Sequence, residues 1–293
     1  MKLGIIGQGF VGSAIYEGLK SFYEVSTYDI DPNKCNSTLE HVCETSDIVF
    51  VCLPTPMMKT GQCDTRILED AIRGIDEVCC NKRPIDRPIL VIKSTVPPGT
   101  TARIENQYTS RPDASPDMQV CFSPEFLTEA NSFEDFKNQN RIIIGGNGAK
   151  KVKQVLRRPF PKIPIVVTKS ETAEMVKYFT NCFLATKVIF ANQMYEVCEG
   201  ANIDYDKVCE YALHDNRIGK THLAVPGHDG DRGFGGHCFP KDLSGIIHFF
   251  ESLGGDANFL KCVREKNLSV RKNRDWETML GRAVSAKDEK PIK

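Results

Sequence analysis

The sequence predicts an α/β protein in which an N-terminal, doubly wound parallel sheet is followed by an all-helical domain. In residues 1–168, short apolar runs alternate with helix-like segments, which is the order expected of right-handed βαβ units. In residues 169–271 the strand-like runs give way to long apolar-periodic stretches that are typical of helices. We therefore expect one domain at 1–168, a second at 169–271, and a polar C-terminal tail at 272–293.

The expected strands of the first domain have continuous rather than alternating hydrophobicity, which is typical of a parallel sheet covered on both faces. Helices are expected between them, for example at Val11–Lys20 and Thr65–Val78. The strand segments are Leu3–Gly7, Glu24–Asp29, Asp47–Pro54, Pro88–Thr95, Gln119–Pro124, Arg141–Gly146 and Ile163–Thr168.

The second domain is expected to open with a long helix. Ser170 begins a run of polar capping and acidic residues, which is a helix-start pattern, and no glycine follows until Gly200. Further helices are expected at Asp204–Leu213 and Asp242–Ser252, so that the whole stretch 169–271 is predicted to be helical. The polar tail either docks on this domain or is loose.

Composition argues against several classes of function. Lys+Arg and Asp+Glu balance at 38 each, so no net field favours nucleic acid or an anionic membrane. No apolar run approaches the ~20 residues of a membrane-spanning helix, and the strand-like first residues leave no room for a signal peptide. The 12 cysteines form neither C-x-x-C pairs nor a zinc-like cluster, so we expect no metal site, a cytoplasmic location, and mostly buried, inert thiols.

The first strand is followed by Gly7-Gln8-Gly9-Phe10-Val11-Gly12, which fits G-x-G-x-x-G and opens a helix. Asp29 ends the second strand, where an acid can bind ribose hydroxyls. This context predicts a Rossmann-type NAD-binding domain rather than a glycine turn that binds nothing. Asp29 favours NAD over NADP because a carboxylate would repel a 2′-phosphate, and Asp31 is a second candidate for the same contact.

Two further motifs, CLPTP at 52–56 and KSTVPPGT at 93–100, follow strands at their carboxyl ends. Open α/β sheets bind ligands at that edge, although plain loop chemistry is the simpler interpretation of each motif alone. In SPEFLTEA, Glu125 and Glu129 follow Pro124 and are expected on one helix face. They either point into a cleft or form a solvated acidic first turn.

Two motifs of the second domain carry candidate reactive groups. Lys177 and Asn181 are four residues apart and either donate to an oxyanion or face solvent. In GFGGHCFPKD, Cys238 lies between a glycine turn and Pro240, which we expect at the first helical position. The positive end of that helix would lower the thiol pKa, and this local argument leaves a nucleophile and an inert thiol equally open.

Five motifs, taken in their order along the chain, resemble the UDP-glucose/GDP-mannose dehydrogenase family from Met1 to about Val263. They are the glycine fingerprint with Asp29, KSTVPPGT, SPEFLTEA, AEMVKYFTN and GFGGHCFPKD. The resemblance implies an enzyme of polysaccharide biosynthesis that oxidises the C6 alcohol of a nucleotide sugar to a carboxylate with two NAD+. UDP-glucose, giving UDP-glucuronate, is the first choice of substrate. The alternatives are GDP-mannose, a UDP-N-acetylhexosamine, or a chain that binds NAD but needs a partner for activity. A β-hydroxyacid dehydrogenase is disfavoured because it would not need the cysteine motif.

The resemblance also implies roles for individual residues. Cys238 would be the nucleophile, and Lys177 with Asn181 would steady oxyanions. Thr95, Glu125 and Asp242 would orient and activate water. The implied cofactor-binding residues are Gly7, Gly9, Phe10, Val11, Gly12, Asp29, Lys34, Pro54, Thr55, Thr95 and Glu129. The implied substrate-binding residues are Glu125, Phe126, Leu127, Lys177, Asn181, Arg217, Gly233, Phe234, Gly235 and Gly236. Arg217 would reach the substrate of a neighbouring subunit, which implies a homodimer through the helical domain.

The sequence departs from the family pattern in two respects. We expect the family's C-terminal, UDP-binding domain to be absent, which leaves the nucleotide open. The segment Lys220–Arg232 is longer than expected, and an exposed loop is its simplest interpretation. A further hypothesis is that this segment contacts the nucleotide diphosphate through His222, His228, Asp229 and Arg232.

Overall fold

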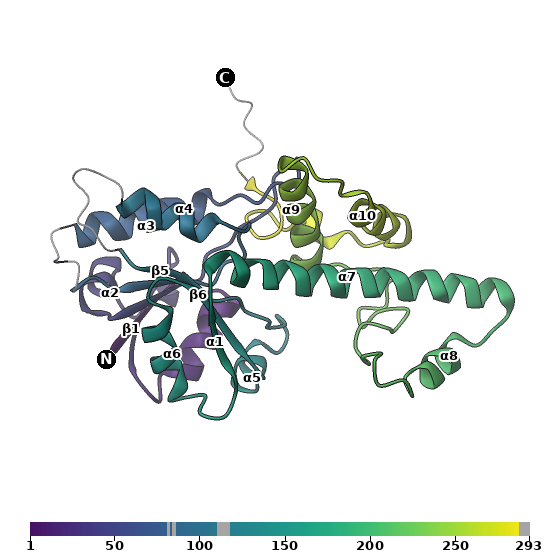
Figure 1. The fold of residues 1–293 in the computed structure, drawn as a ribbon, viewed down its shortest axis with the longest axis horizontal. Coiled ribbons are helices and arrows are strands. Elements are labelled where there is room, and N and C mark those ends of the chain that lie inside the picture. The colour runs from purple at the N-terminus through teal and green to yellow at the C-terminus, as the bar shows by residue number, and fades with distance from the viewer. Residues whose placement is uncertain (81–82, 84–85, 110–117, 287–293) are drawn as a thin grey trace, which may run out of the picture. The chain divides into compact units, whose positions relative to one another are not determined.

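The structure, a computed structural model, describes residues 1–80, 83, 86–109 and 118–286 (Figure 1). Its contacts divide the chain into two units. Unit 1 comprises Met1–Thr55 and Thr65–Lys177, and unit 2 comprises Pro56–Asp64 and Tyr178–Lys293. The division falls after Lys177, inside a helix, and Pro56–Asp64 joins the C-terminal part of the chain.

Unit 1 contains a seven-stranded sheet in the order β2-β1-β3-β4-β5-β6-β7. The seven expected strands and the predicted α/β class are confirmed, with strands shorter than expected. The strands are β1 (Lys2–Ile6), β2 (Glu24–Tyr28), β3 (Ile48–Val51), β4 (Ile89–Ile92), β5 (Val120–Phe122), β6 (Ile142–Gly146) and β7 (Ile165–Thr168). Neighbouring residues of one strand point to opposite faces, so Ile5 and Ile6 enter two separate apolar cores.

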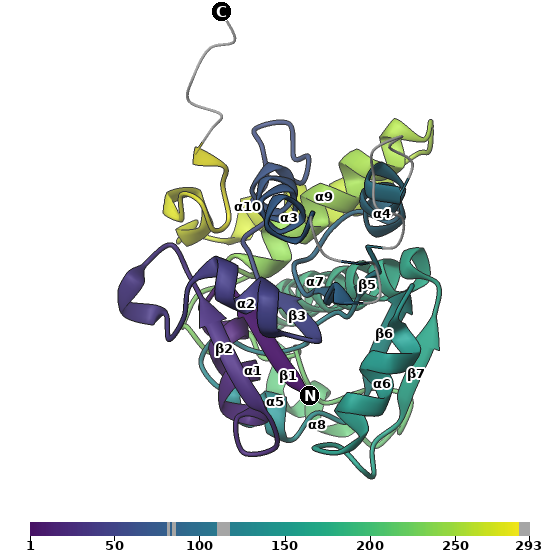
Figure 2. The ribbon, with the colours of Figure 1, turned by 90° about the vertical axis from the view of Figure 1, so that its left-hand side faces the viewer.

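The two faces of the sheet are covered by different helices. Helices α1, α5 and α6 lie on one face of the sheet (Figure 2), where their side chains form one core. The side chains of α2, α3 and α4 pack in the core of the other face. These helices are α1 (Phe10–Leu19), α2 (Leu39–Thr45), α3 (Arg66–Cys79), α4 (Thr100–Thr109), α5 (Ser132–Lys137) and α6 (Ala149–Arg157). Coverage on both faces explains why the central strands β3, β4 and β5 are apolar and buried throughout.

The expectation of an all-parallel sheet is wrong at one junction, because β6 pairs with β5 in the antiparallel sense. The helix between them, α5, has six residues and is about 9 Å long. The remaining pairs, including β6 with β7, are parallel.

The second unit contains the larger part of α7 (Ser170–Ala201), together with α8 (Tyr205–Ala212), α9 (Cys238–Ser252), α10 (Asn258–Val270) and the short 3-10 helix η3 (Asp275–Thr278). Its core joins α7, α9 and α10 through buried residues such as Tyr178, Ile246 and Val263. Within the predicted all-helical stretch 169–271, the loop expected at Lys220–Arg232 is part of a longer segment, 213–237, that forms turns and loop. Its Gly and Asp residues favour turns over helix.

Residues 272–286 belong to unit 2 and are docked there. Met57 donates its N–H to the Ala283 carbonyl at 2.8 Å and accepts from the Ser285 N–H at 2.9 Å. The side chains of Trp276 and Ala283 are buried. This pairing ties Pro56–Asp64 to the C-terminal segment, which explains why the two group together. None of the helices in the described part of the chain combines the length and hydropathy needed to cross a bilayer.

Candidate functional site

The glycine fingerprint in unit 1 forms a tight turn between β1 and α1. A Cβ on Gly12 would lie 1.9 Å from the Gly7 carbonyl oxygen, whereas a Cβ on Gly9 would meet no atom within 4 Å. Gly9 is the N-cap of α1 and provides no side-chain cap. The turn therefore has the close packing and the open backbone that a pyrophosphate at a helix N-terminus needs.

Asp29 lies beside this turn, at the end of β2. Its carboxylate accepts from the Gln8 N–H at 2.6 Å and from the Asp31 N–H at 2.9 Å. Asp31, by contrast, caps the short helix Pro32–Lys34 and pairs with Lys34 at 3.6 Å on the surface. Among the described residues, Gln8 Nε2 is a buried donor without a hydrogen-bond partner. The turn thus fits NAD, with Asp29 better placed than Asp31 and a spare donor in the loop.

A cavity of about 290 Å³ in unit 1 brings together residues predicted for both ligands. Val11 of α1 lines it together with Glu125, Phe126 and Leu127. The Arg141 guanidinium lies 4.1 Å from the centre of the Phe126 ring. At the ends of β3 and β4, the Thr55 hydroxyl donates to the Thr95 carbonyl at 2.6 Å, and both residues are buried.

The predicted helix at SPEFLTEA is wrong, because residues 123–129 are irregular and α5 begins only at Ser132. Lysines from distant positions bind the backbone carbonyls that a helix would use. Lys177 Nζ donates to the Glu125 carbonyl at 2.7 Å and to its Oε1 at 3.0 Å. Lys93 Nζ donates to the Pro124 carbonyl at 3.1 Å. Glu129 is exposed, so Glu125 and Glu129 do not share a helix face.

Sequence reasoning missed Lys93, which lies within KSTVPPGT. Its ammonium group also donates to the Ser123 hydroxyl at 3.2 Å. Burial lowers the pKa of Lys93 to about 8 and raises that of its neighbour Cys52 to about 12. A lysine that directly follows a four-residue apolar strand is the signal that could have identified it.

In unit 2, Cys238 is the first residue of α9, four positions earlier than the expected start at Asp242. Pro240 is therefore the third helical residue rather than the first, which is tolerated because N–H groups of the first turn need no helical acceptor. Cys238 is partly exposed. Asp242, one turn along the same face, is buried and accepts from Asn181 Nδ2 at 2.6 Å.

Lys241 is a second residue that sequence reasoning missed. It is buried and donates to Asp242 Oδ1. Burial, the largest effect, lowers the pKa of Lys241, but the nearby Asp242, Cys63 and Cys238 together raise it above its ordinary value. A fixed positive charge thus acts on the start of α9, in addition to the helix dipole.

The remaining predicted residues of unit 2 have varied surroundings. Phe234 is buried and packs edge-on against Phe239, with ring centres 5.8 Å apart. Arg217 is exposed and pairs with Asp215 in the turn after α8. In the 220–232 segment, Arg232 pairs with Glu199 at 3.2 Å. The diphosphate hypothesis thus stays untested, and two of its charges, Arg232 and Asp229, already have partners within unit 2.

The comparisons with family models are clear. Residues 34–162 match the model described as the NAD binding domain of the UDP-glucose/GDP-mannose dehydrogenase family. Residues 171–269 match the central domain of the same family. NAD, the cofactor expected from the sequence, is thus the one that the description of the first model names.

Individual relatives agree with this assignment. The chain is 33% identical over 260 residues to a UDP-glucose 6-dehydrogenase from Bacillus subtilis, covering 88% of this chain and 54% of the relative. It is 34% identical over 256 residues to a UDP-glucose 6-dehydrogenase from Rickettsia conorii, covering 86% and 56%. The chain thus spans about half the length of these curated relatives.

Among solved structures, a UDP-glucose dehydrogenase from Pyrobaculum islandicum superposes with a TM-score of 0.79 at 30% identity, covering 92% of this chain and 68% of that one. A UDP-D-ManNAc dehydrogenase from Pyrococcus horikoshii, at 24% identity and a TM-score of 0.76, shares the fold. The resemblance first suggested by five ordered motifs is confirmed: the chain belongs to the UDP-glucose/GDP-mannose dehydrogenase family.

Proposed function

We propose that this chain is an NAD-dependent nucleotide-sugar 6-dehydrogenase that oxidises the C6 alcohol of UDP-glucose to the carboxylate of UDP-glucuronate. The observation that best supports the proposal is the start of α9, where Cys238 shares a helix face with Asp242 and Asp242 is bound by Asn181. A partly exposed thiol at a helix N-terminus, beside a buried ammonium group, is a setting that favours a nucleophilic thiolate.

In the proposed reaction, the turn Gly7–Gly12 and Asp29 would hold NAD+, which would supply the hydride acceptor for each of two oxidations. In the first oxidation a hydride leaves C6 and a general base takes the hydroxyl proton, giving an aldehyde. Cys238 then adds to the aldehyde carbon, and Lys177 and Asn181 donate hydrogen bonds to the resulting oxyanion. Loss of the second hydride converts this thiohemiacetal to a thioester.

Water completes the cycle. Thr95, Glu125 and Asp242 orient a water molecule, and one of the two carboxylates takes its proton as the water adds to the thioester. The C–S bond then breaks, and the carboxylate leaves as the thiolate is restored. Lys177 and Asn181 each already bind a carboxylate, Glu125 and Asp242 respectively. Such pairing preorganises the donors and places a proton acceptor next to each of them.

The test is the ratio of NADH to sugar consumed. The purified chain, given NAD+ and UDP-glucose, should form two NADH per sugar, and Cys238→Ala should reduce NADH formation to background. Parallel assays with GDP-mannose and a UDP-N-acetylhexosamine identify the nucleotide sugar. NADH from none of the three would contradict the proposal.

A second candidate is a chain that binds NAD and turns over only together with a partner. Calorimetry separates the two possibilities, because NAD binding without any turnover would favour this second function.

We further propose that the chain forms a homodimer through α7. Phe179, Phe183 and Phe190 are 69%, 60% and 61% exposed, and the first two rings stack with centres 6.4 Å apart. An apolar row of this kind on one helix is typical of a subunit interface.

All 12 cysteines are free thiols, which supports the proposed cytoplasmic location because disulfides persist mainly in oxidising compartments.

A further inference from the structure

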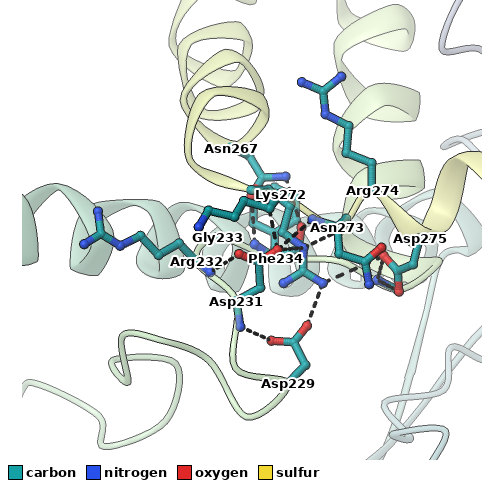
Figure 3. Close-up of polar contacts among 12 residues, drawn as sticks. Asp229, Asp231, Arg232, Gly233, Phe234, Asn267, Lys272, Asn273, Arg274 and Asp275 are labelled. Carbon is teal, nitrogen blue, oxygen red and sulfur yellow. Dashed lines mark hydrogen bonds and ion pairs between the residues drawn. The ribbon is translucent and has the colours of Figure 1, made fainter.

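The four residues that precede His237 and Cys238 form a loop, Gly233–Gly236, whose backbone is bound by side chains from three other elements (Figure 3). From α7, Asn192 Oδ1 accepts from the Gly233 N–H at 3.1 Å. From α10, Asn267 binds Phe234. From η3, both carboxylate oxygens of Asp275 accept from the Gly236 N–H at 3.1 Å. Three of the loop's residues are therefore fixed by groups remote in sequence.

Asn267 provides the most complete of these contacts. Its Oδ1 accepts from the Phe234 N–H at 2.7 Å, and its Nδ2 donates to the Phe234 carbonyl at 3.0 Å. The side chain thus pairs with the loop backbone as a neighbouring strand would. Gly233 has a φ of +68°, and a Cβ there would lie 2.3 Å from Asn267 Oδ1. This contact gives the first glycine of the motif a packing role independent of any ligand.

The Arg271 side chain lies next to the second glycine of the loop, Gly235. A Cβ on Gly235 would lie 2.2 Å from Arg271 Nη2. The guanidinium is buried and pairs with Asp229 at 2.6 Å, with Asp231 at 3.6 Å and with Asp275 at 3.9 Å. One buried cation therefore links the 229–231 turn, the glycine loop and η3.

The acidic side chains around Arg271 outnumber it, but backbone donors offset the excess charge. Asp231 Oδ2 accepts from the Lys272 N–H at 3.0 Å and from the Asn273 N–H at 2.7 Å. Asp275 accepts from Gly236, as described above. Each carboxylate is thus held by more than one donor, which favours a single geometry for the cluster.

The cluster holds the loop that lies directly before His237 and Cys238 in the chain. Gly236 is separated from Cys238 only by His237, the N-cap of α9. Arg271 and Asp275 lie beyond residues 171–269, which match the central-domain model, and outside all the motifs singled out above. The direction of the first turn of α9, and with it the direction of the Cys238 thiol, depends on where Gly236 is held.

We propose that Asn267, Arg271 and Asp275 are positioning residues for Cys238. They act through the loop Gly233–Gly236, which they hold so that the thiol at the start of α9 points in one direction. The consequence for turnover rests on the proposed function, whereas the positioning of the loop and of the thiol does not.

The test uses Asp275→Ala, because Asp275 is part-exposed and its removal leaves the core intact. Lys272→Ala is the matched control, since it removes an exposed side chain of the same segment and keeps the backbone N–H that Asp231 accepts. Asp275→Asn is the conservative variant, as it keeps an acceptor oxygen for the Gly236 N–H. Asn267→Ala provides an independent way of releasing the loop, with circular dichroism to check that it folds.

In Asp275→Ala, amide hydrogen exchange in the peptide spanning 233–236 should become faster by about tenfold, the lower end of the scale of one charge-assisted hydrogen bond. Alkylation of Cys238 by iodoacetamide, followed by mass spectrometry of its peptide, should become faster by a similar factor as the thiol samples more exposed positions. With an active chain, kcat should fall while KM changes little. Lys272→Ala should match the parent, and Asp275→Asn should recover most of the loss.

Unchanged exchange in Asp275→Ala would overturn the proposal. So would faster exchange with unchanged Cys238 alkylation, because the loop would then be held without positioning the thiol. Neither measurement requires turnover, so a chain that forms no NADH would contradict the proposed function and leave this test intact.

Discussion

At the scale of single residues, Lys93 is a buried lysine of unit 1 whose pKa is strongly lowered. Its ammonium group borders the 290 Å³ cavity and donates to the Pro124 carbonyl and the Ser123 hydroxyl. Burial lowers its pKa from 10.5 to about 8. The lysine therefore fixes the segment before Glu125 as a hydrogen-bond donor. The free energy that its burial costs depends on whether the amine is protonated.

This cost gives a pH-dependent stability with a definite sign. Between pH 8 and 10.5, the unfolded chain keeps the lysine proton that the folded chain has released, so the free energy of unfolding rises with pH. The rise should be about 2 kcal/mol, below the full linkage value because the side chain borders a cavity. In Lys93→Met this contribution should be missing.

Urea unfolding of the parent and of Lys93→Met, on either side of that pH window, measures the effect. The difference in unfolding free energy between the two proteins should grow with pH in favour of the parent. Lys150→Met, at an exposed position on α6, is the control and should show no such growth. A pH-independent difference would show that burial does not lower the pKa of Lys93.

At the scale of elements, α4 depends on a carboxylate from another helix. Glu174, in the second turn of α7, is fully buried and accepts from the Gly99 N–H at 2.6 Å. It also accepts from the Thr101 N–H at 2.8 Å and the Thr101 hydroxyl at 2.6 Å. Burial raises the pKa of Glu174 even though these bonds lower it. The Glu174 carboxylate therefore caps the N-terminus of α4, where the helix dipole favours a negatively charged side chain.

Replacing Glu174 with alanine should destabilise unit 1 by about 3 kcal/mol, because three buried donors lose their acceptor. Glu174→Gln should cost less, since the amide oxygen still accepts. Glu171→Ala, at an exposed position of the same helix, is the control and should change stability little. Denaturant unfolding gives the energies, and faster exchange of the Gly99 and Thr101 amides would localise the loss. Equal stability of Glu174→Ala and Glu171→Ala would refute the cap.

At the scale of the whole molecule, the proposed dimer rests on the exposed aromatic face of α7. Phe183→Asp and Phe190→Asp should each convert a dimer to a monomer, because a buried carboxylate without a partner opposes association. Sedimentation equilibrium measures the mass directly. Phe259→Asp changes a phenylalanine that is 67% exposed on α10 and should leave the dimer intact. A parent that sediments as a monomer would contradict the assignment.

Several features of the molecule could be predicted from the sequence because they depend on neighbouring residues. The seven strands follow from continuous apolar runs, and the turn at Gly7–Gly12 follows from glycine spacing. The position of Cys238 near the start of a helix follows from the local pattern of glycine and proline, with an error of a few residues. The family followed from the order of the motifs.

Other features were decided only by the tertiary structure, because they depend on groups far apart in the chain. Residues 123–129 fail to form a helix since Lys93 and Lys177 bind their carbonyls. The loop before Cys238 is held by Asn267 and Asp275, which are 33 and 39 residues from the groups they bind. No local pattern encodes such pairings: a buried polar group takes whichever partner the packed chain brings within reach, and that partner is known only once the fold is formed.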